Sequence, residues 1–193
     1  MAKDFKLKVL NIMSGAEFGG AEFFFERLAL SFERKKNIQQ KIIMKSDKKR
    51  LKNLKMSISD IEEIILFKFY NPFCLLKIEN IISEFEPDIV LTWMNRASSL
   101  IPNKKFKNEI TVGRLGGFYK IKNYAKCDYL ITNTMDIREY VIEQGWEEQK
   151  VEFIPNFVFR NKNSKIDFEI KKKDVLICMG RFHENKGIDI LIK

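Results

Sequence analysis

Short apolar segments alternate with segments of helical periodicity along most of the chain, and this alternation limits its fold more than any other feature. The first unit shows the pattern. A strand expected over Lys8 to Met13 leads through a loop with glycines into a helix from about Ala21, where apolar residues recur at helical spacing. Repeated strand–helix units predict an α/β fold: a Rossmann-like parallel sheet with helices on both faces.

The remaining elements follow the same order. Strands are expected over 39–44, 63–67 and 87–93, from 110, and over 126–132 and 151–154; helices are expected over 47–55, 72–85 and from 133 to Gly145. Parallel sheets of this kind bind ligands beyond the carboxyl ends of their strands. The residues that directly follow each strand are therefore the candidate site residues.

The length of the chain fits one complete domain and part of a second. With 193 residues and 45% hydrophobic content, the chain can form one well-packed core but not two full α/β domains. We expect a Rossmann-like domain over residues 1–156 and a polar interdomain linker over 157–173. Residues 174–193 are expected to form the first strand, loop and helix start of an incomplete second domain.

The charge is strongly basic. There are 35 Lys and Arg residues against 26 Asp and Glu residues, a net charge of +9, which suits a polyanion or an anionic surface as a partner. Lysine clusters such as Lys48-Lys49-Arg50 are equally explained by solvated loops and helix faces. The sequence has no basic-aromatic recognition motif and no metal-finger spacing, so nucleic acid is not the expected partner.

The cysteines and the N-terminus indicate a cytoplasmic protein. Cys74, Cys127 and Cys178 lie far apart and form no Cys-x-x-Cys pair, which argues against a disulfide framework and a zinc site. The first residues lack the apolar core of a signal peptide, and no apolar stretch reaches the roughly 18 residues of a spanning helix. We expect no metal and no cofactor.

Gly19 and Gly20 follow the first strand and precede the first helix. Glycines at this point allow close approach of the backbone to a ligand, and the helix start that follows attracts an oxyanion. The spacing is not the dinucleotide fingerprint, because Gly-x-Gly-x-x-Gly is absent. A simple turn explains the two glycines equally well.

Two later strand ends carry polar and basic residues. Asn95 and Arg96 follow the strand that ends at Trp93, and Arg114 is followed closely by Gly116 and Gly117. Both arginines are candidates for bidentate contacts with a phosphate or carboxylate. The alternative is that one or both pair with acidic residues and hold the loops.

The last motif, Gly180-Arg181-Phe182-His183-Glu184-Asn185-Lys186-Gly187, follows an apolar run and opens a helix at Ile188. A buried strand that ends in this way is typical of a phosphate-binding edge in α/β proteins. His183 is the only histidine, and a lone histidine is more often a loop or packing residue than a general base. Catalytic residues are not identified by the sequence.

Three motifs in order resemble family-4-type glycosyltransferases of the two-domain GT-B architecture. They are Gly19-Gly20-Ala21-Glu22, Ile154-Pro155-Asn156-Phe157-Val158, and the Gly180 to Gly187 motif. The resemblance implies the N-terminal, acceptor-side domain followed by the opening of the nucleotide-sugar domain. It places Gly180, Arg181, Lys186 and Gly187 at the donor diphosphate, where an arginine and a lysine stabilise the leaving group electrostatically without a metal.

The resemblance also implies a function and a missing part. It predicts a retaining transferase that moves a sugar from a nucleotide-sugar to a lipid-linked or lipopolysaccharide-type acceptor, with peripheral contact to the anionic inner face of the cytoplasmic membrane. The family's Glu-x7-Glu motif has no counterpart here. The expectation is a truncated chain or one completed by a separately encoded C-terminal half; the alternative is a non-catalytic acceptor-binding domain.

Overall fold

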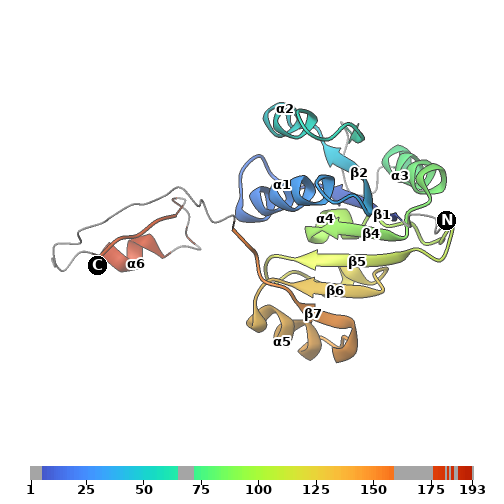
Figure 1. Ribbon diagram of the computed structural model, residues 1–193. Coiled ribbons are helices and arrows are strands. Elements are labelled where there is room, and N and C mark those ends of the chain that lie inside the picture. The colour runs from blue at the N-terminus through green and yellow to red at the C-terminus, as the bar shows by residue number, and fades with distance from the viewer. Residues whose placement is uncertain are drawn as a thin grey trace. The chain divides into compact units, whose positions relative to one another are not determined.

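The computed structural model describes residues 6–64, 72–158, 176–180, 182, 184 and 187–192. The chain divides into two compact units, Met1–Phe157 and Val158–Lys193. The first unit is a seven-stranded sheet with helices on both faces (Figure 1). Its strands are β1 Leu7–Met13, β2 Ile38–Lys45, β3 Ile61–Ile64, β4 Ile89–Trp93, β5 Ile110–Leu115, β6 Tyr129–Thr132 and β7 Val151–Phe153. Its helices are α1 Gly20–Glu33, α2 Lys48–Lys55, α3 Pro72–Phe85, α4 Met94–Ser98 and α5 Met135–Glu143, with short 3₁₀ turns η1 Ile121–Tyr124 and η2 Glu148–Lys150.

All strand pairs of the sheet are parallel. The order is β3-β2-β1-β4-β5-β6-β7, and the direction of the order reverses between β1 and β4. The register places Met13 of β1 beside Trp93 of β4, and Trp93 beside Arg114 of β5. This arrangement confirms the predicted Rossmann-like α/β fold. Because all strands are parallel, their carboxyl ends lie at the same edge of the sheet.

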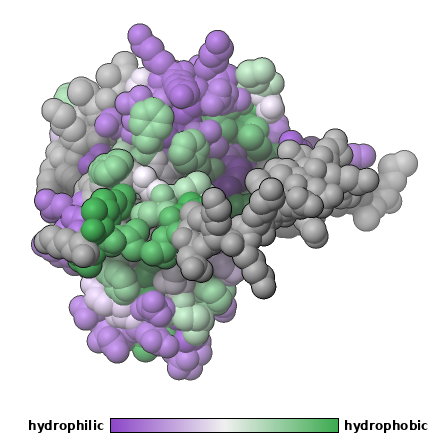
Figure 2. All heavy atoms as spheres, turned by 90° about the vertical axis from the view of Figure 1, so that its left-hand side faces the viewer, coloured by the Kyte–Doolittle hydropathy of each residue, from purple (hydrophilic) through white to green (hydrophobic). Residues whose placement is uncertain are grey.

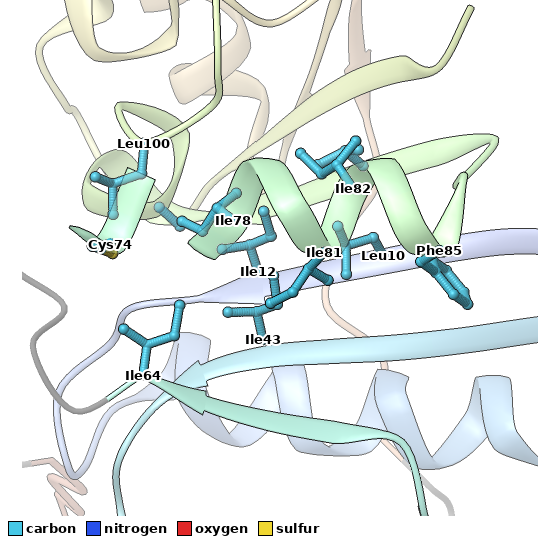
Figure 3. Close-up of a cluster of buried hydrophobic side chains, with 12 residues drawn as sticks. Leu10, Ile12, Ile43, Ile64, Cys74, Ile78, Ile81, Ile82, Phe85 and Leu100 are labelled. Carbon is cyan, nitrogen blue, oxygen red and sulfur yellow. The ribbon is translucent and has the colours of Figure 1, made fainter. Parts of the chain in front are cut away.

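Different helices bury the two faces of the sheet. On one face, Phe24 and Phe25 of α1 and Leu54 of α2 pack against Ile42 and Trp93. On the other face, α3 supplies an apolar stripe that contacts β1, β2 and β3. Figure 3 shows Ile78, Ile81 and Phe85 of α3 directed toward Leu10, Ile12 and Ile43. Burial of this kind contributes roughly 1.5–3 kcal/mol per large apolar side chain.

A third cluster lies beneath α5 and η1. It contains Leu115, Tyr124, Leu130 and Val141, all fully buried. Burial raises the pKa of the neighbouring Cys127 thiol to about 12, so this thiol is protonated and unreactive at neutral pH. The described cysteines are all free thiols.

Polar side chains cap the helix starts. The Asp47 carboxylate accepts hydrogen bonds from the Lys49 and Arg50 backbone N–H groups at the start of α2. Thr134 Oγ1 accepts from the Ile137 N–H at 3.3 Å and caps the start of α5. After α5, Gly145 adopts φ 98°, a left-handed conformation that favours glycine.

The second unit differs from its prediction in one respect. Residues 176–179 form no strand, and Leu176, Ile177 and Met179 are exposed. The prediction of a buried strand is wrong for these residues. A strand must pair with a neighbouring strand, and the described part of this unit contains none. The helix expected from Ile188 is present as α6, Ile188–Ile192, after Gly187 with φ 59°. Residues 159–173 of the expected linker lie outside the described residues.

Asp128 ties the start of β6 to β5. Burial alone would raise the pKa of Asp128, but hydrogen bonds from Lys105 and Thr111 outweigh it and lower that pKa. A carboxylate whose pKa is lower in the folded state stabilises the fold above its unfolded pKa, about 3.9, and loses that contribution as the pH falls through the folded pKa.

We therefore predict that Asp128→Ala lowers the free energy of unfolding by about 1–2 kcal/mol at pH 7, since it removes hydrogen bonds to a charged acceptor. The loss should shrink below about pH 4, where the carboxylate of the unfolded chain becomes protonated, and disappear as the pH falls through the lower pKa of the folded state. Urea unfolding at both pH values measures this. An equal loss at pH 7 and pH 3 would contradict the assignment.

None of the helices in the described part of the chain has the length and apolar character that a membrane crossing requires.

Candidate functional site

Three loops meet at the carboxyl edge of the sheet, on both sides of the β1–β4 switch point. They follow β1, β4 and β5, so they contain the glycine loop, Asn95 and Arg96, and Gly116 and Gly117. In Figure 1 the strands β5 and β6 point to the left, so Figure 2 views this edge of the domain. The structure thus brings together candidates that lie about one hundred residues apart in the sequence.

The β1–α1 loop is organised around a buried carboxylate. Glu22 is 5% exposed, and its Oε1 atom accepts a hydrogen bond from the Ala16 N–H at 2.8 Å. A Cβ atom at Gly15 would lie 2.7 Å from Glu22 Oε1, and one at Gly19 would overlap Glu22 Oε2. Gly20 has open space around it. Gly15 and Gly19 therefore leave room for the Glu22 carboxylate, a role that spacing alone does not reveal.

Arg50 fixes the same loop from the other side. Its guanidinium donates to Glu26 at 2.8 Å, to Asp47 at 3.0 Å, and to the Ala16 and Glu17 carbonyls at 3.3 and 2.8 Å. At 5% exposed it is no part of a solvated basic face. For this one member of the Lys48 to Arg50 cluster, the interpretation as a surface charge is wrong, because the side chain folds inward onto two carboxylates.

The end of β4 combines an aromatic side chain with a strained backbone. The Trp93 indole N–H donates to Asn11 Oδ1 at 3.2 Å beneath the edge. Met94, the next residue, adopts φ 61°, which is unfavourable for a side chain other than glycine and is common at functional sites. Asn95 and Arg96 follow in the short helix α4, half-buried at this edge.

Arg114 is buried against two aromatic rings. Its guanidinium carbon lies 4.6 Å from the ring centre of Phe24 and 5.6 Å from that of Trp93. Its Nη2 atom donates to the Ile154 carbonyl at 3.1 Å and to Asn156 Oδ1 at 2.8 Å. Burial lowers the pKa of Arg114 to about 10, which still leaves it charged at neutral pH. Arg114 holds the chain after β7 onto the sheet, through a carbonyl and an amide rather than an acidic residue.

The glycines after β5 face the start of α1. A Cβ atom at Gly116 would lie 3.7 Å from the Ala21 Cβ, and one at Gly117 would lie 3.5 Å from the Tyr119 ring. Burial and the negative charge of Glu22 both raise the pKa of Tyr119, which places the phenol within electrostatic reach of that carboxylate. The β1 and β5 loops are therefore immediate neighbours.

Two polar atoms at this edge are buried without a hydrogen-bond partner in the described structure. They are Ser14 Oγ at the end of β1 and Asn133 Oδ1 after β6. Buried polar atoms are nearly always hydrogen-bonded in proteins, so both are candidates for ligand or water contacts. Neither residue was named as a candidate from the sequence; their position directly after a strand is the signal that could have identified them.

The motif of the second unit is only partly described. Gly180 and Gly187 are described, whereas Arg181, His183 and Lys186 lie outside the described residues. The described residues contain no group of His, Cys, Asp and Glu side chains that could hold a metal ion.

The comparisons with known proteins agree with this geometry. No family model matches the chain. It is 27% identical to the lipopolysaccharide core biosynthesis glycosyltransferase LpsE of Rhizobium meliloti, over 97% of this chain and 55% of that protein. The chain thus spans about half the length of this curated relative. The resemblance to glycosyltransferases that the motifs indicated is confirmed.

Solved structures support the fold. The lipopolysaccharide outer core galactosyltransferase WaaB superposes with a TM-score of 0.62 at 18% identity, over 79% of this chain and 46% of WaaB. Anabaena HepE in complex with UDP-glucose superposes with a TM-score of 0.60 at 14% identity, over 78% of this chain and 44% of HepE. At these identities the likeness establishes the fold: the described sheet has the architecture of one Rossmann-like half of these proteins.

Proposed function

We propose that this chain belongs to a glycosyltransferase that moves a sugar from a nucleotide diphosphate sugar to a lipopolysaccharide-type acceptor. The observation that carries the proposal is the 27% identity to LpsE along almost the whole of this chain. The first unit supplies the acceptor side, since its carboxyl edge presents the glycine loop, α4 and the β5 loop around one switch point.

The donor side rests on the second unit. We propose that Arg181 and Lys186, with the Gly180 and Gly187 backbone, stabilise the leaving diphosphate, which removes the need for a metal. A UDP-sugar is the first donor to test, because HepE has been solved with UDP-glucose. Retention of configuration at the anomeric carbon is part of the proposal and follows from the family resemblance alone.

A second candidate function is acceptor binding without catalysis. It rests on the first unit alone, whose carboxyl edge presents the glycine loop, α4 and the β5 loop around one switch point. In that case the chain would bind an oligosaccharide and transfer nothing to it.

One experiment separates these functions. The full chain is incubated with deacylated lipopolysaccharide core oligosaccharide and a panel of nucleotide-sugars, and the products are analysed by mass spectrometry. A donor-dependent mass gain of one sugar supports the transferase. Oligosaccharide binding with no mass gain from any donor supports the binding domain. If the chain neither binds the oligosaccharide nor transfers a sugar to it, both functions are rejected.

We also propose peripheral contact with an anionic membrane through α2. Lys48, Lys49, Lys52 and Lys55 are exposed there, beside the exposed Met56. Figure 2 shows hydrophilic side chains gathered at the top of the view, where α2 lies. Basic residues near an anionic surface contribute about 1 kcal/mol each. Flotation with vesicles should therefore increase with anionic lipid content; flotation independent of that content would contradict the contact.

A further inference from the structure

A cavity of about 360 Å³ lies at the carboxyl ends of β1 and β2, to one side of the switch point. Its walls are the loop after β1, from Gly15 to Glu17, and the segment from Met44 to Arg50 at the start of α2. The volume falls within the range of small-molecule sites in proteins, about 300–1,000 Å³. From the sequence, the Lys48-Lys49-Arg50 cluster and the neighbouring glycine loop pointed toward this region.

Lysine ammonium groups dominate the accessible charge of the cavity. Lys45, Lys48 and Lys49 line it, all three are exposed, and the described structure shows no carboxylate within ion-pair distance of any of them. Lys49 Nζ lies 5.4 Å from the ring centre of Phe18. Glu17 is the one lining carboxylate that no described basic side chain neutralises, so positive charge is in excess.

The rest of the lining is fixed in place before any ligand arrives. The Arg50 guanidinium already donates hydrogen bonds to Glu26 and Asp47, and to the Ala16 and Glu17 carbonyls of the opposite wall. Asp47 in turn occupies two free N–H groups of the α2 start. An anion would therefore be bound by the lysines and not by the helix terminus. The hydrogen bonds from Arg50 keep the two walls at a constant separation, which reduces the ordering cost of binding.

We propose that this cavity binds a phosphomonoester carried by a saccharide. Three ammonium groups around one small cavity suit a compact, doubly charged anion such as a phosphomonoester, because lysine binds phosphate as a point charge. The only lining arginine is already engaged. That the phosphate is carried by a saccharide, and that this saccharide belongs to the transferase acceptor, rest on the proposed function; binding of the phosphomonoester group itself does not.

The test compares two double variants of the full chain on the same helix. Lys48→Gln with Lys49→Gln removes two cavity charges, and Lys52→Gln with Lys55→Gln removes two charges of α2 outside the cavity. Isothermal titration uses glucose 6-phosphate, glucose and inorganic phosphate as probes. We expect glucose 6-phosphate to bind and glucose not to bind. The cavity variant should weaken glucose 6-phosphate binding about tenfold or more, because it loses two charge-assisted contacts, while the control changes less than about twofold.

The outcomes distinguish binding in the cavity from binding by the general charge of α2, and a sugar phosphate from a lipid headgroup. Equal weakening in both variants would overturn the proposal in favour of the general basic charge of α2. Binding of phosphatidylglycerol vesicles that depends on Lys48 and Lys49, with no binding of glucose 6-phosphate, would overturn it in favour of a lipid headgroup. Selective sugar-phosphate binding in a chain that transfers no sugar would leave this site standing and reject only the transferase, since the titration contains no donor.

Discussion

Arg114→Ala is expected to lower the free energy of unfolding by about 3 kcal/mol. The side chain is 6% exposed and packs against the rings of Phe24 and Trp93, where desolvated cation–π contacts contribute about 2 kcal/mol or more. Truncation also leaves the Ile154 carbonyl and Asn156 Oδ1 without their donor, at about 1–3 kcal/mol for a buried group. Chemical denaturation measures the change.

Arg138→Ala serves as the control for this variant. Arg138 pairs with the exposed Glu148 at 2.9 Å and also donates to the Val151 carbonyl at 3.1 Å. An exposed ion pair contributes about 0–1 kcal/mol and a neutral hydrogen bond about 0.5–1.5 kcal/mol, with no desolvated cation–π contact in addition. A loss at Arg114 no larger than the loss at Arg138 would contradict the stabilising role of these aromatic contacts. Arg114→Lys should fall between the two, because an ammonium keeps the charge but loses the planar stacking surface.

Gly19→Ala should cost about 2–3 kcal/mol of stability and also weaken acceptor binding. The new methyl group would occupy the position of Glu22 Oε2, so the carboxylate must leave its buried place and the Ala16 N–H loses its acceptor. The backbone of Gly19, with φ 170°, is extended and accessible to any residue. The cost therefore arises from the overlap and not from the backbone.

Gly20→Ala is the matched control, since it adds the same atom one residue later, where nothing lies within 4 Å. Its stability should stay unchanged or rise by a few tenths of a kcal/mol, because alanine favours a helix more than glycine does. In a Glu22→Ala background the cost of Gly19→Ala should largely disappear. Additive losses in the double variant would contradict the steric explanation.

The strands and helices were predictable because their signals are local. Hydrophobic periodicity located the sheet, and residues such as Asp47, Thr134 and Gly145 marked helix ends through contacts with neighbours close in sequence. The direction of the strands then placed the candidate residues at one edge. The sequence pattern alone therefore predicts at which edge of the sheet the site lies, but not the chemistry of the site.

The roles of individual charged residues were not predictable, because they depend on contacts across the fold. Arg114 and Phe24 are distant in sequence, and their stacking exists only after β4, β5 and α1 assemble. Arg50 belongs to a lysine-rich run that looks like a solvated surface, yet it reaches back to Glu26 and the β1 loop. Likewise, the Glu22 carboxylate fills the space beside Gly19 that was expected to be open to a ligand.

The central claim is that the carboxyl edge of this sheet receives an acceptor saccharide. Its most direct test is a ¹H–¹⁵N NMR titration of the full chain with lipopolysaccharide core oligosaccharide. We predict chemical-shift changes at the amides of residues 15–20, 94–96 and 116–117, with little change at the opposite edge, around Asn108 and Gly145. Changes concentrated at that opposite edge, or none at saturating oligosaccharide, would contradict the claim.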